Sequence, residues 1–145
     1  MKTLIARLVG MLEIAGGLFG LFIYGARAFQ LRAPLPFALM LLGALAFALV
    51  LVAGVRLLEG DERGWRWSSW LQLAQIPILA TPLVTYGWSV GATAGLVVRL
   101  GSGWSFGYRL PSAEWMLRLG EGRGWFLGVN FIAVIAFLLL RLARR

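Results

Sequence analysis

The sequence has no cysteine and no histidine, and only six of its 145 residues are acidic. Without cysteine there are no disulfide bonds and no thiol nucleophile, and without histidine there is no Ser-His-Asp triad. The two side chains that most often ligate zinc or haem are therefore missing. The chain also lacks a glycine-rich phosphate loop, a serine nucleophile elbow and the ligand spacing of a calcium loop. We expect a protein that is not an enzyme and that carries no metal and no cofactor.

Charged residues are scarce as well. They make up 14% of the chain against 60% hydrophobic residues, which is too apolar for the wet surface of a soluble domain. The net charge is +8, but the basic residues lie in short segments between apolar runs, as topology signals do, and not in a stripe that would bind nucleic acid. We expect residues 1–145 to form a single integral membrane domain whose partner is the lipid bilayer. All basic residues but Lys2 are arginine, which suggests a GC-rich genome and hence the bacterial cytoplasmic (inner) membrane.

Four apolar stretches are long enough to cross a membrane: residues 4–24, 35–57, 68–88 and 124–142. A helix needs about 20 apolar residues to cross a hydrocarbon layer about 30 Å thick. The first stretch imitates a signal peptide, but it is longer than the usual apolar region of one and contains Glu13, so we expect it to be retained. The sequence therefore predicts an all-α membrane protein, a bundle of four transmembrane helices.

The third stretch does not end cleanly, because hydrophobicity continues from Trp70 to Leu100. A single helix of that span would be about 45 Å long, which exceeds the bilayer even when tilted. Either Pro77 and Pro82 separate an interfacial piece from a later spanning helix, or the spanning helix ends near Gly87. The residues that follow favour the second alternative.

From Tyr86 to Leu110, apolar residues recur at every second position, which is typical of a half-buried strand. A loop at residues 101–103 would close a β-hairpin in which apolar residues face one another. In this register Leu96 lies opposite Tyr108, and the rest of the apolar face pairs Val98 with Phe106 and Leu100 with Trp104. The alternative is a helix-packing face made by Gly87, Gly91 and Gly95, which are spaced by four.

An open hairpin edge cannot lie in lipid with unpaired backbone groups, so we expect the hairpin in an outer cap formed by residues 89–123. A short interfacial helix is expected over 112–119, between the third and fourth transmembrane helices. The cap is a candidate interaction surface. Its contact residues would be Val98, Leu100, Trp104, Phe106 and Tyr108.

The basic residues predict the orientation of the bundle. Eight of the 14 lie on the side of the chain ends in this topology and six lie on the other side. The positive-inside rule then places the N- and C-termini in the cytoplasm and the hairpin outside. Tryptophans gather near the ends of the predicted spans, as amphipathic rings do at a membrane interface.

Glu13 is the ionisable residue deepest in an apolar run, and intramembrane carboxylates commonly mark a function. It could be a proton or cation site, or it could be a buried hydrogen-bonded residue that fixes helix register. Gln72 and Gln75, three residues apart, enter the membrane at a similar depth, and we expect Gln75 to bond to Glu13. Asn130 in the fourth span would make a matching contact with Thr85. These candidate intramembrane polar residues are Glu13, Gln72, Gln75 and Asn130.

Three functions are compatible with these observations. The first is a non-catalytic subunit or scaffold of a membrane assembly, with a membrane-protein partner or as a homo-oligomer. The second is a small proton- or cation-coupled transporter or channel that uses Glu13. The third is a membrane-acting toxin or its immunity protein. We favour the first, because the apolar hairpin face and the glycines on helix faces suit protein contacts.

Overall fold

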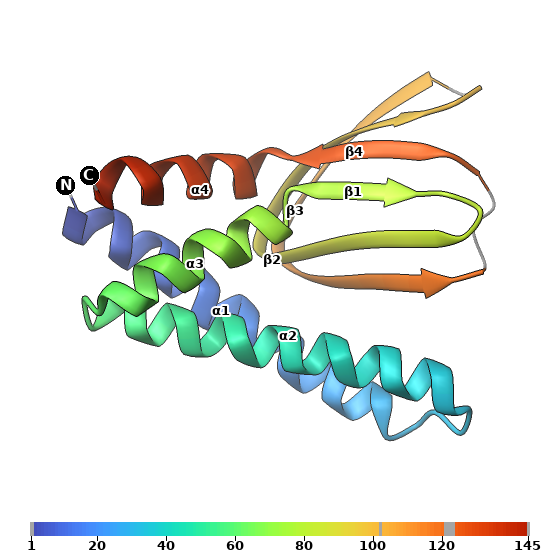
Figure 1. The fold of residues 1–145 in the computed structure, drawn as a ribbon, viewed down its shortest axis with the longest axis horizontal. Helices are drawn as coiled ribbons and strands as arrows, with labels where there is room; N and C mark the ends of the chain where they lie inside the picture. Colours follow the sequence, from blue (N-terminus) through green and yellow to red (C-terminus); the bar gives the residue numbers. More distant parts are fainter. Residues whose placement is uncertain (1, 102, 121–123, 145) are drawn as a thin grey trace.

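The computed structural model describes residues 2–101, 103–120 and 124–144. These residues form four helices and a four-stranded antiparallel sheet (Figure 1). The prediction of an all-α bundle of four transmembrane helices is therefore wrong. Two long helices span the whole length of the molecule, whereas two short helices and the sheet share that length between them.

The two long helices are α1 (Lys2–Ala28) and α2 (Pro34–Leu58). In the described part of the chain, they alone are long and apolar enough to cross a membrane, judged by length and composition. The first two predicted spans are thus found as helices. A proline at the start of α2 suits the first helical turn, where a backbone N–H has no helical acceptor. Glycines let α1 and α2 pack closely, since a Cβ added to Gly17 would lie 2.8 Å from the backbone nitrogen of Leu51.

The two short helices are α3 (Glu62–Ala74) and α4 (Phe131–Arg144). With 13 and 14 residues they are about 20 Å long, too short to cross a bilayer alone. The predicted spans 68–88 and 124–142 are therefore wrong. Asp61 caps α3 by accepting a 3.0 Å hydrogen bond from Arg63 N, which starts the helix earlier than predicted. The helix stops before Pro77, which has no backbone N–H and disfavours helical geometry in the residue before it.

The sheet contains β1 (Pro77–Ala80), β2 (Val84–Arg99), β3 (Gly103–Leu119) and β4 (Phe126–Asn130). The hydrogen-bonded order is β1-β4-β2-β3, and β1 also pairs with the start of β2. All these pairs are antiparallel. Both β4 and the first half of β2 run opposite to β1, whereas the second half of β2 runs opposite to β4. The two halves of β2 therefore run in opposite directions, and the strand must bend between them.

The bend lies at Gly91, whose φ of +77° favours glycine and where the β2–β3 register shifts. The ribbon of β2 and β3 thereby folds into two arms. One arm pairs residues 84–91 with 112–119, and the other pairs 93–99 with 103–109. The arms flank β1 and β4, so the whole sheet curls around an interior (Figure 1).

The predicted hairpin exists, but its register differs by two residues. Val98 lies opposite Trp104 and Leu96 lies opposite Phe106. Since the difference is an even number, each side chain keeps the face that the sequence predicted. The interfacial helix predicted over 112–119 is wrong because this segment is the second half of β3. The alternative helical face of Gly87, Gly91 and Gly95 is also wrong, since all three lie in β2.

The sheet lies beside the second half of α1 and the first half of α2, and α3 and α4 lie beside the remaining halves (Figure 1). Asn130 N donates to Ile76 O at 2.9 Å, so the sheet ends of α3 and α4 meet at one level. Two apolar clusters hold the layers together. The cluster at the terminal end contains Ile5, Ala6, Val9, Leu57, Leu140 and Ala143, and the cluster below the sheet contains Tyr24, Ala44, Phe47, Val50, Trp88 and Val90.

Candidate functional site

Glu13 is buried between α1 and α3, with 1% of its surface exposed. Its carboxylate accepts hydrogen bonds from Ser68 Oγ at 2.7 Å and from Gln72 Nε2 at 3.0 Å. Gln72 was among the predicted polar residues, and Ser68 was missed although it lies one helical turn before Gln72. Burying a carboxylate is costly unless donors satisfy it, and α3 supplies both donors here. The contact is enclosed and joins two helices.

The sequence predicted a hydrogen bond between Gln75 and Glu13, but Gln75 bonds to other residues. Its Oε1 accepts from Val90 N at 3.0 Å, and its Nε2 donates to Leu71 O at 3.2 Å. Val90 precedes the bend of β2, so Gln75 fastens the end of α3 to that bend. The spacing of Gln72 and Gln75 did predict a shared face, but the two residues serve different neighbours.

The sequence also predicted a contact between Asn130 and Thr85, but Asn130 makes no hydrogen bond with Thr85. Its Oδ1 accepts from Ala94 N at 3.4 Å, at the junction of β4 and α4. Its Nδ2 is buried and has no partner among the described residues. The four candidate polar residues are all buried, but the structure brings only Glu13 and Gln72 into direct contact.

The interior of the curled sheet contains two adjoining cavities of about 420 and 300 Å³. Both are lined by Ile78, Thr93, Glu114 and Met116. The first cavity is also lined by polar residues from both strands of the hairpin, and the second extends to Tyr24 on α1. The polar residues lining one or both cavities include Ser89, Thr93, Arg99, Ser105, Arg109, Glu114 and Arg118.

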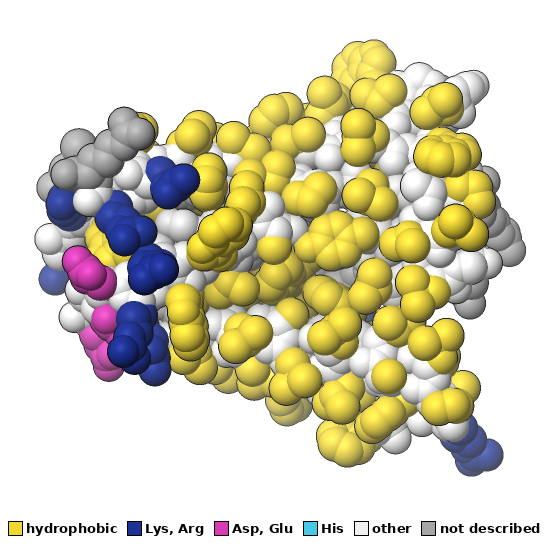
Figure 2. Space-filling view, viewed as in Figure 1, with side chains coloured by type: hydrophobic (Ala, Val, Ile, Leu, Met, Phe, Trp, Pro, Cys, Tyr) yellow, Lys and Arg dark blue, Asp and Glu magenta, His cyan; other side chains and the backbone are white. Residues whose placement is uncertain are grey.

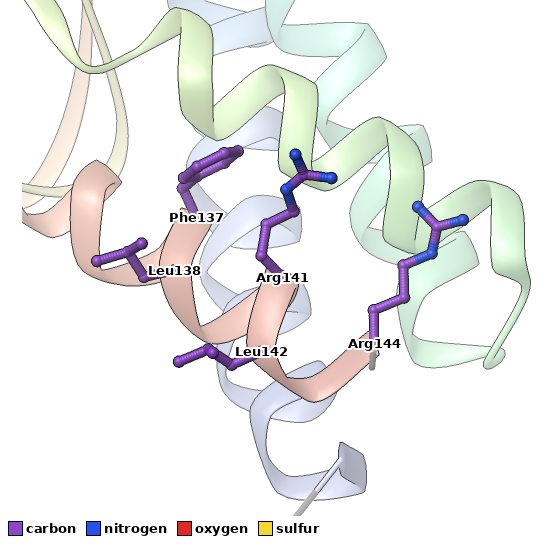
Figure 3. Close-up of a pocket in the computed structure, with 5 residues that line it drawn as sticks. All are labelled: Phe137, Leu138, Arg141, Leu142 and Arg144. Atoms are coloured by element: carbon purple, nitrogen blue, oxygen red, sulfur yellow. The ribbon is translucent and has the colours of Figure 1, made fainter.

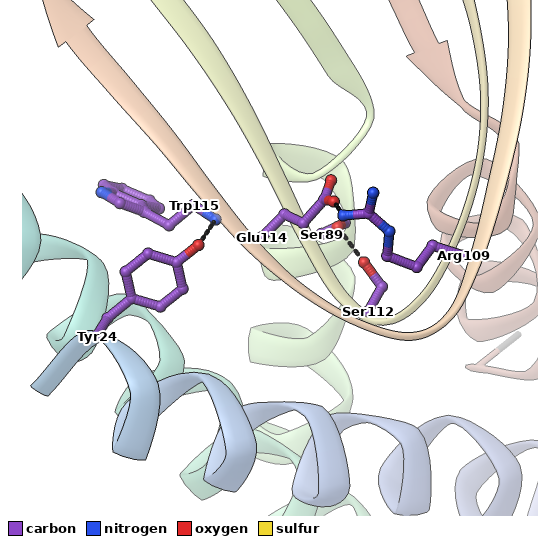
Figure 4. Close-up of polar contacts among 6 residues, drawn as sticks. All are labelled: Tyr24, Ser89, Arg109, Ser112, Glu114 and Trp115. Atoms are coloured by element: carbon purple, nitrogen blue, oxygen red, sulfur yellow. Dashed lines mark hydrogen bonds and ion pairs between the residues drawn. The ribbon is translucent and has the colours of Figure 1, made fainter. Parts of the chain in front are cut away.

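Two polar contacts bridge the ribbon near its bend (Figure 4). Arg109 and Glu114 form an ion pair between the two halves of β3, and both side chains keep access to solvent. Ser89 and Ser112 are buried, and their hydroxyl oxygens lie 2.6 Å apart across the β2–β3 pair. An exposed ion pair contributes little to stability, so the buried serine pair is the stronger structural element of the two.

Tyr24 and Trp115 fasten the sheet to the long helices. Trp115 N donates to the Tyr24 hydroxyl at 2.8 Å, and Trp115 Nε1 donates to Leu39 O at 3.0 Å. Figure 4 shows Trp115 turned toward the helices, whereas its neighbour Glu114 points into the curl of the sheet. Along the strand most polar side chains face the interior and most apolar ones face outward or toward the helices, although Met116 also lines the cavities.

The predicted interaction surface lies on the outer face of the sheet. All five of its residues are exposed, from 50% for Val98 to 83% for Tyr108. Leu127 and Val129 of β4 extend the same face. The space-filling view shows apolar side chains over most of the visible face and most of its charged ones at the end that carries the termini, with a basic side chain also at the opposite end (Figure 2). The outer face is thus apolar and exposed, whereas the inner face combines charged and polar side chains with Ile78, Val97, Met116 and Phe126.

The sequence prediction missed the interior residues of the sheet. Arg99, Ser105, Arg109 and Glu114 were not singled out as a group, although the two-residue period already placed Arg99 and Ser105 on the face opposite the apolar one. Within the described ranges, no group of three or more Asp or Glu residues is placed to hold a metal ion. Comparisons of this chain with known protein families, with curated proteins and with solved structures found no match.

Proposed function

We propose that this chain is a non-catalytic subunit of a membrane assembly, and that its curled sheet lies within the apolar layer beside α1 and α2. The main support is the contrast between the two faces of the sheet: its outer face is apolar and exposed, whereas its inner face carries charged side chains such as Arg109 and Glu114 among apolar ones such as Met116. Because its side chains are apolar, the outer face could lie among lipid tails without the free-energy cost of removing polar side chains from water. In water, the same face would be a contiguous exposed apolar surface of a kind that monomeric soluble proteins rarely carry.

The distribution of charge supports one orientation. The end of α2, the start of α3 and the end of α4 lie at the end of the molecule that carries the termini (Figure 1), and these segments contain Arg56, Arg63, Arg66, Arg141 and Arg144. The positive-inside rule places such an end in the cytoplasm. We therefore propose a bacterial cytoplasmic-membrane protein whose termini are cytoplasmic and whose hairpin tip points outward.

The open edge of β3 supports a role in assembly. In the described residues, β3 has one strand neighbour, β2. Trp115 N finds an acceptor in the Tyr24 hydroxyl, which satisfies one group of this edge. The arm at residues 103–109 has no comparable helix contact, and unpaired backbone groups are strongly disfavoured in lipid. A strand from another chain, either a second copy or a partner subunit, would satisfy them.

The enclosed position of Glu13 argues against transport through that residue. A proton or cation site needs access to water, whereas Glu13 is held between Ser68 and Gln72 with almost no exposed surface. The contact instead suits a residue that fixes the register of α1 against α3.

Cysteine cross-linking in native membranes tests this proposal, because the chain has no cysteine of its own. Tyr108→Cys places a thiol on the arm of β3 at residues 103–109, and Phe22→Cys places one at a similarly exposed position on α1. We expect oxidation or a short bifunctional reagent to give a discrete adduct with Tyr108→Cys and none with Phe22→Cys. A second copy of the chain would double the mass, and a partner would add its own. Equal adducts at both positions, or none at Tyr108→Cys, would contradict the proposal.

A further inference from the structure

A basic pocket lies between α3 and α4 near the termini, far from the sheet (Figure 3). A cavity of about 520 Å³ is lined along α4, and a smaller one of about 80 Å³ lies between α4 and α3. Phe137, Arg141 and Arg144 line both cavities, so the two adjoin one another. From α3, the smaller cavity adds Arg66, Ser69, Trp70 and Leu73.

Helix geometry brings the three arginines together. Arg141 and Arg144 are three residues apart and so share a face of α4, and Figure 3 shows both side chains directed toward α3. Because α3 and α4 run in opposite directions, the first half of α3 meets the last turns of α4, and Arg66 joins the pair. Arg141 is held by Phe137, whose ring centre lies 5.7 Å from its guanidinium carbon.

The pocket has three positive charges and, among its described lining residues, no carboxylate. Basic residues in the last turn of a helix offset the negative end of its dipole, which accounts for Arg141 and Arg144 individually. It does not account for Arg66, which comes from the first half of another helix. Three guanidiniums in one pocket repel one another, and an anion with several oxygens would relieve that repulsion through bidentate hydrogen bonds.

The pocket also has an apolar side. Leu138 and Leu142 line it on α4 and Trp70 lines it on α3, and all three are at least half exposed. The site therefore has a cationic end near the termini and an apolar flank that continues onto the hydrophobic surface (Figure 2). A ligand that matches both parts has an anionic head and an apolar tail.

We infer that this pocket binds the phosphate of an anionic phospholipid from the leaflet on the terminal side. The phosphate would lie among Arg66, Arg141 and Arg144, and an acyl chain would lie along Leu138 and Leu142. Basic pockets between helices on the cytoplasmic side of a membrane recognise such headgroups. The inference rests on the membrane placement proposed above.

Native mass spectrometry of the detergent-purified full chain tests the inference. The protein is titrated with phosphatidylglycerol or with phosphatidylcholine, which share acyl chains but differ in net charge. We expect wild type to retain phosphatidylglycerol about tenfold better, and the variant R66Q/R141Q/R144Q to lose that preference. The control R27Q/R32Q/R99Q removes the same charge elsewhere and should keep it. Equal retention of both lipids by wild type, or equal loss of preference in the control, would overturn the inference.

Two further measurements separate the alternatives. Excess inorganic phosphate should not displace phosphatidylglycerol, because it lacks the acyl chain; full displacement would indicate a site for free anions and would overturn the lipid assignment. Wild type and R66Q/R141Q/R144Q should both float with vesicles of pure phosphatidylcholine. Failure of wild type to float would refute the membrane placement itself, whereas flotation without lipid preference would refute only the pocket.

Discussion

The backbones of Gly16 and Gly91 touch, and a Cβ added to Gly16 would overlap the backbone nitrogen of Gly91. This contact joins the middle of α1 to the bend of β2, where the sheet turns. Gly91 is constrained from its own side as well, because a Cβ there would lie 2.8 Å from Leu12 O and its φ is +77°. Two glycines thus allow a helix and a folded strand to lie in direct contact.

Enlarging Gly16 should destabilise the fold. Gly16→Val forces the bend of β2 away from α1, and overpacking of this kind typically costs about 1–3 kcal/mol. The measurement is thermal or denaturant unfolding in detergent. Gly25→Ala is the matched control, since nothing lies near the added Cβ and alanine favours a helix. If both variants unfold like wild type, the two backbones are not in contact.

Removing the carboxylate of Glu13 should also destabilise the protein. Glu13→Ala leaves the buried donors of Ser68 and Gln72 without an acceptor, at a cost of about 1–3 kcal/mol. Glu13→Gln keeps the size and one acceptor oxygen, so its loss should be clearly smaller. Unfolding of the two variants in the same detergent measures the difference. An equal loss for Glu13→Gln and Glu13→Ala would contradict this expectation, since both variants lack the charge, and would show that the charge itself is required.

Gln75 should be needed for the attachment of the sheet to α3. Gln75→Leu removes the acceptor of Val90 N and leaves a buried donor unpaired, which should cost about 1–3 kcal/mol. Hydrogen exchange should rise at Val90 and its strand neighbours more than in α1. Gln30→Leu, at an exposed position outside the helices, should leave exchange unchanged. Uniform exchange across the molecule in Gln75→Leu would contradict a local role.

The ion pair of Arg109 and Glu114 should contribute little to stability. Both side chains are partly exposed, and such pairs are typically worth below about 1 kcal/mol. Glu114→Gln should therefore unfold almost like wild type, whereas Ser112→Val, which disrupts the buried serine pair, should lower stability more. The reverse order in unfolding experiments would show that the cavity is drier than its polar lining indicates.

The sequence predicted the two long helices because each is a long apolar run with no proline after its first turn. It failed after Ala74, where hydropathy alone does not distinguish a helix from an apolar strand. Pro77 was the available signal, and it ends α3 instead of kinking a longer helix. The segment 112–119 carries the same two-residue alternation that revealed the hairpin, through Trp115, Leu117 and Leu119, but it was interpreted as a helix.

The rest of the sheet depends on contacts distant in the chain. β1 and β4 have four and five residues, and their pairing joins Ile78 to Gly128 across about 50 positions. No local pattern reveals such a pair. At the polar site, the shared face of Gln72 and Gln75 was predicted, but which of them reaches Glu13 depends on how α1 and α3 are staggered, and that is set by packing.

If the sheet lies in the bilayer with its charged face inward, neighbouring positions on β3 should have different surroundings. Single spin labels are placed at Ser105→Cys, facing the cavity, and at Phe106→Cys, facing outward, in the reconstituted protein. We expect the label at 106 to be accessible mainly to oxygen, which partitions into lipid, and the label at 105 to be accessible mainly to a water-soluble nickel complex. Equal accessibility of both labels to the nickel complex would place the sheet in water and contradict the account.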